Sequence, residues 1–153
     1  MTFDTIKTMK ILIVSDSHSD YESLDRLYKM YPNMDLYIHA GDSEQDEFSI
    51  KPFISVRGNC DHYYDFQNFL VIPSPKGNIY VQHTPYVSKS VIYEHNAKIV
   101  IHGHTHTRRL EENNGILFIN PGAISFARDK YDGSYAILTI EDNGIDVKFY
   151  TLK

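Results

Sequence analysis

Short apolar runs at close intervals, each followed by a loop rich in glycine and polar residues, strongly limit how this chain can fold. Residues 10–15 form the first such run, and their β-branched side chains predict a buried strand. Asp20 can cap a helix that extends to about Met30. Residues 35–39 and 53–56 predict the next two strands. A strand, a helix and a strand in succession predict parallel pairing with crossover connections.

The second half of the chain has a different pattern. Six runs predict further strands: residues 66–72, 78–82, 98–101, 116–119, 135–140 and 145–150. Residues 86–96 predict a helix. Asn114-Gly115 and Asn143-Gly144 lie between pairs of these strands, and Asn-Gly is the strongest short-range signal for a hairpin. A parallel first half and a hairpin-rich second half together predict two sheets packed face to face, with helices outside.

Length and composition favour a single folded domain over residues 1–153. Compact domains commonly run about 100–200 residues. A content of 42% hydrophobic and 23% charged residues argues against a disordered chain. Because residues 1–8 precede the first apolar run, we expect them to be a dispensable N-terminal extension.

The charge and the single cysteine argue against several other functions. The formal net charge is −5 and there is no long run of lysine or arginine, so we expect no nucleic acid as a structural partner. Cys60 is the only cysteine, which rules out an internal disulfide and a cysteine-based zinc cluster. No apolar stretch approaches the roughly 20 residues of a membrane helix. Residues 1–10 lack the apolar segment of a secretory signal, so we expect a cytoplasmic protein without a membrane partner.

Five of the predicted strands are followed by residues that can bind metal ions. In chain order these residues are Asp16 and His18, Asp42, Asn59, His83, and His104 with His106. Loops that follow parallel strands converge beyond one edge of the sheet, where ligands collect in α/β proteins. We therefore expect these seven side chains to lie together.

These residue types suit a pair of metal ions that acts on a phosphate ester. Two ions about 3.5–4 Å apart can contact both the attacking and the leaving oxygen of a phosphoryl transfer. We expect Asp16 and His18 to lie on the same side of an extended segment, and His104 and His106 likewise. Gly103 would allow the backbone to approach closely. Carboxylate and imidazole ligands without a thiolate favour Mn, Fe, Ni or Zn over Mg or Ca.

The ordered motifs resemble the five sequence blocks of the calcineurin-like metallophosphoesterase superfamily. They are Asp16-x-His18, Gly41-Asp42, Gly58-Asn59-Cys60-Asp61, His83 and Gly103-His104-x-His106. The Gly-Asn-Cys-Asp form, the segment Asn120-Pro121-Gly122-Ala123 and the short length resemble its small bacterial and archaeal phosphodiesterase branch. That branch is also related to a retromer scaffold subunit.

The resemblance implies an α/β fold, a four-layer α/β/β/α sandwich of two mixed sheets. It also implies two divalent transition-metal ions per chain, with manganese a common metal and zinc, iron or nickel as substitutes. The implied ligands are Asp16, His18 and His106 for one ion, Asn59, His83 and His104 for the other, and Asp42 as the bridge. Asn59 and His104 are also expected beside the phosphate, as catalytic residues.

One residue of the third block departs from the larger members of the superfamily. They have a histidine where this chain has Cys60, placed to steady or protonate the leaving oxygen, and a thiol is a poor proton donor to an alkoxide. Cys60 and His62 are therefore candidate residues of the substrate pocket. His39 and His102 lie beside ligand blocks, and we expect them to be hydrogen-bonded in the core instead of binding a metal.

The sequence thus predicts a phosphoesterase that hydrolyses phosphodiesters or activated phosphomonoesters through a metal-bridging hydroxide. The alternative is a catalytically inactive metal-binding scaffold like the retromer relative. The complete set of seven ligands favours the enzyme, because a scaffold need not keep them. A metal-sensing or metal-storage protein would need an output domain, for which the sequence gives no sign. The expected partner is a small phosphate ester, and the sequence leaves a homo-oligomer open.

Overall fold

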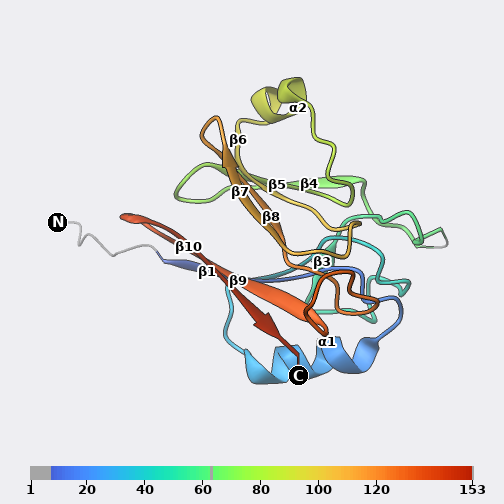
Figure 1. The fold of residues 1–153 in the computed structure, drawn as a ribbon. Helices are drawn as coiled ribbons and strands as arrows, with labels where there is room; N and C mark the ends of the chain where they lie inside the picture. The colour runs from blue at the N-terminus through green and yellow to red at the C-terminus, as the bar shows by residue number, and fades with distance from the viewer. Residues whose placement is uncertain (1–7, 63, 153) are drawn as a thin grey trace.

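The computed structural model describes residues 8–62 and 64–152 (Figure 1). Residues 1–7 of the predicted N-terminal extension lie outside this described part. The elements are β1 (Met9–Val14), α1 (Tyr21–Met30), β2 (Leu36–His39), β3 (Ile54–Ser55), β4 (Phe69–Ile72), β5 (Asn78–Gln82), α2 (Lys89–Glu94), β6 (Ala97–Ile101), β7 (Arg109–Asn113), β8 (Ile116–Asn120), β9 (Ser134–Glu141) and β10 (Gly144–Thr151). Within the described residues, no helix is long and apolar enough to cross a membrane.

The strands form two sheets of five strands each. The first has the order β10-β9-β1-β2-β3, and the second has the order β4-β5-β6-β8-β7. Both are mixed, since each contains parallel and antiparallel pairs. Helix α1 lies beyond the first sheet and α2 beyond the second (Figure 1). The predicted four-layer α/β/β/α sandwich is therefore confirmed.

Alternating side chains of β1 explain why the first sheet is covered on both faces. Ile11 and Ile13 belong to the apolar cluster between the two sheets, together with residues from both. Leu12 and Val14 belong to the cluster that includes Leu24 and Leu27 of α1. Successive side chains of a strand point to opposite faces, so a continuous apolar run can be buried on both sides.

The parallel strands bring the predicted site residues to one end of the sandwich. In the first sheet, β1 pairs parallel with β2, and β2 with β3. In the second sheet, β6 pairs parallel with both β5 and β8. The loops after β1, β2, β3, β5 and β6 carry the seven candidate ligands. Parallel strands end at the same edge of a sheet, which is why residues far apart in the sequence can meet there.

The sequence did not predict β7, and this changes the topology of the second sheet. Asn114-Gly115 forms a hairpin between β7 and β8, whereas β6 and β8 run parallel. Most of the side chains of β7 are exposed at the edge of the sheet, so it lacks the apolar alternation of a half-buried strand. The second predicted hairpin, β9 with β10, is confirmed, but it pairs with β1 and extends the first sheet.

Two other predicted elements are shorter than expected. The strand predicted over residues 66–72 begins at Phe69. The helix predicted over residues 86–96 is limited to α2. Ser88 caps this helix by accepting a hydrogen bond from the Val91 N–H, and Asn96, with a φ of 50°, follows its end. Capping residues define helix ends more sharply than apolar periodicity does.

Candidate metal centre

The loops that follow β1 and β6 turn sharply where the candidate ligands begin. Asp16 and His18 have φ angles of 53° and 45°, and His104 and His106 have φ angles of 74° and 61°. The expectation that each pair lies along an extended segment is therefore wrong, although both members of each pair do reach the same site. Left-handed backbone is costly for residues other than glycine, and it clusters at functional sites where the surrounding structure holds it.

Two glycines allow these loops to approach one another. A Cβ atom on Gly103 would lie 1.9 Å from Ser15 Oγ and 2.7 Å from Asp16 Oδ2. A Cβ atom on Gly58 would lie 2.0 Å from Asp42 Oδ1. The predicted close approach at Gly103 is confirmed, and any larger residue at either position would displace a candidate ligand.

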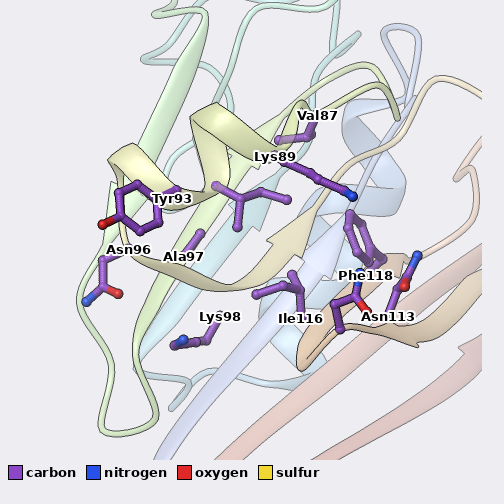
Figure 2. A pocket seen from close by; sticks show the side chains of 11 residues that line it. Val87, Lys89, Tyr93, Asn96, Ala97, Lys98, Asn113, Ile116 and Phe118 are labelled. Atoms are coloured by element: carbon purple, nitrogen blue, oxygen red, sulfur yellow. The ribbon is translucent and has the colours of Figure 1, made fainter.

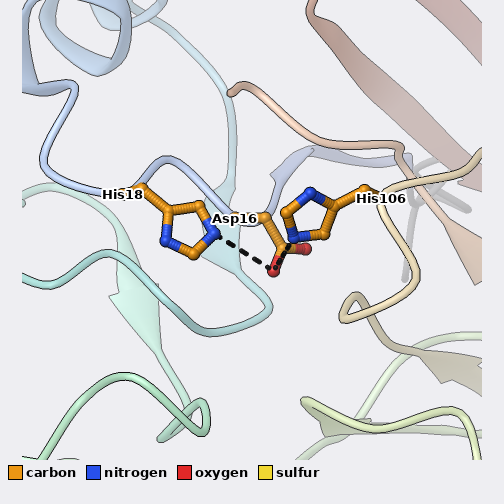
Figure 3. A group of neighbouring side chains, drawn as sticks. All are labelled: Asp16, His18 and His106. Carbon is orange, nitrogen blue, oxygen red and sulfur yellow. Dashed lines mark ion pairs between the residues drawn. The ribbon is translucent and has the colours of Figure 1, made fainter. Parts of the chain in front are cut away.

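Asp16 lies at the centre of the cluster. Its Oδ1 atom is 3.3 Å from His106 Nε2, 3.8 Å from His83 Nε2 and 4.0 Å from His18 Nε2; Figure 3 shows the contacts with His106 and His18. Asp42 Oδ2 lies 3.2 Å from His83 Nε2. Asp16 thus belongs to two groups whose ligand atoms lie within 4.8 Å of one another, one with His18 and His106 and one with Asp42 and His83.

Asn59 and His104 extend the second of these groups. Asn59 Oδ1 lies 2.9 Å from His83 Nε2 and 3.2 Å from His104 Nδ1. His104 Nδ1 also lies 3.3 Å from His83 Nε2. The structure therefore brings all seven candidate ligands into one cluster. Asn59 is exposed and His104 is half-buried, so this side of the cluster is accessible from outside.

The donors and acceptors of the cluster fit a site for cations. Three histidines direct Nδ1 at an oxygen atom: His18 at Glu44 Oε1 (2.6 Å), His83 at the Ala40 carbonyl (2.7 Å) and His106 at the Phe126 carbonyl (2.8 Å). Each contact places the ring proton on Nδ1, so Nε2 of the neutral ring presents a lone pair. Those lone pairs face carboxylate oxygens, which are also acceptors. Asp16 Oδ1 and His18 Nε2 are both buried without a hydrogen-bond partner, and a cation would satisfy both.

Electrostatic interactions keep the two carboxylates ionised. Burial alone would raise the pKa of Asp42, but the contact with His83 and a hydrogen bond from the Cys60 N–H outweigh it and lower this pKa to about 2. Burial also opposes ionisation of Asp16, yet the contacts with His106 and His83 lower its pKa. The same contact with Asp16 raises the pKa of His106. A metal ion bound to these Nε2 atoms would displace any proton there, because a ligand histidine must be neutral.

His39 and His102 support the neighbouring loops, which confirms the expectation of hydrogen-bonded core residues. His39 Nδ1 accepts from the Gly41 N–H at 3.0 Å, so its Nε2 donates to Ser17 Oγ at 2.8 Å. His102 Nδ1 contacts the carbonyl of the following residue, and its Nε2 accepts from Arg109 Nη1 at 3.0 Å. Burial lowers the pKa of each histidine to about 4, so both rings are neutral.

Glu44 is a supporting residue that the sequence analysis missed. Its carboxylate, 2.6 Å from His18 Nδ1, fixes the orientation of that ring and makes Nε2 more basic. In the sequence, Glu44 looks like any other acidic residue of a polar loop, for example Glu47. Only the tertiary contact distinguishes the two.

Asp61 is a second missed support, although it belongs to the Gly-Asn-Cys-Asp motif. It is completely buried. Its carboxylate accepts hydrogen bonds from the backbone N–H groups of Asp42, Glu44 and Gly58 at 2.9, 2.9 and 2.8 Å. Asp61 therefore joins the loop after β2 to the loop after β3. An aspartate three residues after a glycine at the end of a strand is a signal for such a turn, since short polar side chains bond to nearby backbone.

Cys60 lies at the edge of the cluster. Its backbone N–H donates to Asp42 Oδ1 at 2.7 Å, and Asn59 Nδ2 lies 3.6 Å from its sulfur atom. Burial, together with the negative charges of Asp42 and Glu44, raises the pKa of the thiol to about 11, so it is neutral. His62 is exposed on the loop that follows. A role for either residue in the substrate pocket stays a prediction.

A cavity of about 730 Å³ lies elsewhere, beside α2 and on the outer face of the second sheet. Figure 2 shows Val87, Lys89, Ile116 and Phe118 among the residues that line it. None of the seven candidate ligands lines this cavity. The metal cluster is the better candidate site, because its polar groups are buried and converge.

Comparisons with known proteins agree with this assignment. The calcineurin-like phosphoesterase superfamily domain matches residues 9–143. The chain is 37% identical to the probable metallophosphoesterase YsnB of Bacillus subtilis (strain 168), over 93% of this chain and 90% of that protein. It is 28% identical to a protein of Streptococcus pneumoniae TIGR4 described as a predicted phosphoesterase. That crystal structure has a TM-score of 0.86 and the match covers 96% of this chain and 91% of the other.

More distant structures share the fold. A novel archaeal phosphodiesterase has a TM-score of 0.72 at 22% identity, over 94% of this chain and all of the other. Vacuolar Protein Sorting 29 from Cryptosporidium parvum has a TM-score of 0.75 at 20% identity, over 95% and 92% of the two chains.

Two mixed sheets, with clustered aspartates and histidines at the ends of their parallel strands, define a class of phosphate-ester hydrolases. The chain belongs to the calcineurin-like phosphoesterase superfamily, since the domain match covers most of its length and the Bacillus relative aligns along nearly all of it. The resemblance that the motifs predicted is thereby confirmed.

Proposed function

We propose that this chain hydrolyses phosphodiesters or activated phosphomonoesters with two divalent transition-metal ions, of which manganese is the first candidate. The observation that supports this most directly is the convergence of histidine Nε2 lone pairs on two buried carboxylates, with Asp16 Oδ1 and His18 Nε2 left unpaired. Bound there, the ions would supply Lewis acidity and an activated water for attack on phosphorus.

The residues of the chain divide this work among them. The proposed ligands are Asp16, His18 and His106 for one ion, Asn59, His83 and His104 for the other, and Asp42 for both. Their orientation is maintained by the carboxylate of Glu44 and by the carbonyls that contact His83 and His106. Asn59 and His104 lie on the accessible side, so we place the phosphate next to them.

A scaffold that binds metal without turnover remains the rival, since Vacuolar Protein Sorting 29 has a similar fold. The full ligand set favours the enzyme, because a scaffold need not keep all seven ligands. The substrate would be a small phosphate ester in the cytoplasm. No large basic surface is needed, because the ions provide positive charge locally.

The test is to strip the protein of metal, reload it with Mn²⁺, Zn²⁺, Fe²⁺ or Ni²⁺, and assay a panel of phosphodiesters and phosphomonoesters. We expect hydrolysis that depends on the added metal, and Asp42→Asn should lose it. Asp146→Asn, the same substitution at an exposed position on β10, is the matched control and should keep full activity. Two ions bound per chain without turnover of any ester would support the scaffold instead.

A further inference from the structure

The ring of Phe126 stands beside the candidate metal centre and is largely uncovered. Its centroid lies 5.6 Å from that of the His18 ring, edge to face, and the His18 ring in turn lies 5.3 Å from that of His106. The side chain is nevertheless 75% exposed. Single exposed aromatic residues are common on protein surfaces. Phe126 differs from them because its ring contacts the ring of a candidate metal ligand.

The backbone around Phe126 is fixed to the ligand loops on both sides. The Phe126 carbonyl accepts from His106 Nδ1 at 2.8 Å, and the Arg128 N–H donates to the His106 carbonyl at 2.9 Å. On the other side, the Ser125 N–H donates to the Asp16 carbonyl at 3.1 Å. The backbone that carries the ring is therefore held in place relative to the ligands of the first ion.

The fold itself gives no reason for a phenylalanine at this position. Phe126 has a φ of 59°, a left-handed conformation that asparagine and glycine adopt readily and bulky residues rarely do. Because most of the ring is exposed, its burial contributes little to the core. A strained residue with an exposed ring at a metal site indicates a contact that forms only when a substrate is present.

We propose that Phe126 forms an aromatic-binding subsite, and that the preferred substrate is a phosphate ester bearing a planar aromatic group such as a nucleobase or an aryl ring. This inference rests on the proposed phosphoesterase activity. The faces of aromatic rings stack on one another, and each base stacked on a protein side chain contributes on the order of tenfold or more in binding. The net charge of −5 favours a single nucleotide-sized ester over a polynucleotide.

The test compares two phosphodiesters that release the same p-nitrophenol and differ in the other ester group, phenyl or cyclohexyl. The leaving group is constant, and the different electronic effects of phenyl and cyclohexyl on phosphorus are the same for every variant. A change in the phenyl-to-cyclohexyl ratio of kcat/KM between two variants therefore reports recognition. We expect this ratio to be about tenfold higher for the manganese-loaded parent protein than for Phe126→Leu, because the substitution slows the phenyl ester alone. A purely hydrophobic contact would instead favour cyclohexyl at least as much.

Two further variants make the comparison specific. Phe126→Asn removes the ring and suits the left-handed backbone, so it serves if the leucine variant is unstable. Tyr93→Leu removes a ring on α2 that is 88% exposed. Helix α2 precedes β6, whereas the loop with His104 and His106 follows β6, so Tyr93 lies at the opposite end of this strand from these ligands. It should keep the phenyl preference. Equal loss of activity toward both esters together with loss of metal in the Phe126 variants would overturn the proposal, because the ring would then only support His18.

A binding measurement separates this inference from the proposed function. Phenylphosphonate and cyclohexylphosphonate have no ester bond to cleave, so calorimetry with the manganese-loaded protein measures recognition without turnover. Tighter binding of phenylphosphonate that is lost in Phe126→Leu supports the subsite even if no ester is hydrolysed, in which case only the proposed function fails. Hydrolysis without any phenyl preference, and equal affinity for both phosphonates, would overturn the subsite and leave the function standing.

Discussion

Among single residues, Asp42 is the one that we propose as the bridge between two ions. Its carboxylate contacts His83 directly, and its ligand atoms lie within 4.8 Å of those of His18. We predict that Asp42→Ala loses both metal ions, whereas Asp16→Ala loses mainly the ion shared with His18 and His106. Elemental analysis of purified, metal-loaded variants measures this. Full occupancy in Asp42→Ala would rule out the bridging role.

Cys60 leads to a prediction about leaving groups. A neutral thiol with a pKa of about 11 is a weak proton donor to a departing alkoxide. Rates should therefore depend steeply on leaving-group acidity, with aryl esters reacting well and simple alkyl esters poorly. Cys60→His should accelerate poor leaving groups more than good ones, since general acid catalysis contributes about 10²–10⁴ only where a proton is needed.

The measurement for Cys60 is a series of esters with graded leaving groups, assayed for both proteins at matched metal content. Metal content must be matched because the new imidazole lies next to Asn59 in the sequence. A parent protein with little dependence on the leaving group would show that another residue supplies the proton, and His62 is the first to test.

At the scale of elements, the loops after β2 and β3 depend on Asp61. We predict that Asp61→Ala destabilises the protein by about 1–3 kcal/mol or more, because three backbone N–H groups lose a buried acceptor. It should also weaken metal binding at least tenfold, since it loosens the segments that carry Asp42 and Asn59. Chemical denaturation and metal titration by calorimetry measure the two effects.

Asp20→Ala is the control for this prediction. Asp20 caps α1 by accepting from the Ser23 N–H at 3.1 Å, and losing such a cap costs about 0.5–2 kcal/mol. This variant should lose stability and keep its metal affinity, because α1 packs on the far face of the first sheet. Equal metal affinities of the two variants would show that Asp61 stabilises the fold without positioning the ligands.

At the scale of the whole molecule, the candidate site joins the two sheets. Asp16, His18, Asp42 and Asn59 follow strands of the first sheet, and His83, His104 and His106 follow strands of the second. A ligand that binds only the folded state stabilises it by about 2.7 kcal/mol at a hundredfold excess over Kd. We predict that Mn²⁺ raises the Tm by about 5–10 °C per tightly bound ion. Thermal scans with Mn²⁺ and with a chelator measure this, and Asp42→Ala should show a much smaller rise.

Features that depend on neighbouring residues could be predicted from the amino-acid sequence alone. Apolar runs predicted nine of the ten strands, Asp20 predicted the start of α1, and Asn143-Gly144 predicted the β9–β10 hairpin. These signals are local, because periodicity, capping and turn conformation act over a few residues. The seven candidate ligands were also recognisable, because parallel strands deliver the residues that follow them to one edge.

The pairing of the strands and the contacts that hold the candidate ligands became visible in the three-dimensional structure. The exposed strand β7 acquires its conformation from β8, and the β9–β10 hairpin joins the first sheet through β1. The left-handed turns at the ligands, the Glu44 contact with His18 and the position of Phe126 likewise depend on residues far apart in the chain. These contacts join segments that are far apart in the chain, and their interactions offset the cost of the strained backbone. A pattern within one short segment therefore cannot predict them.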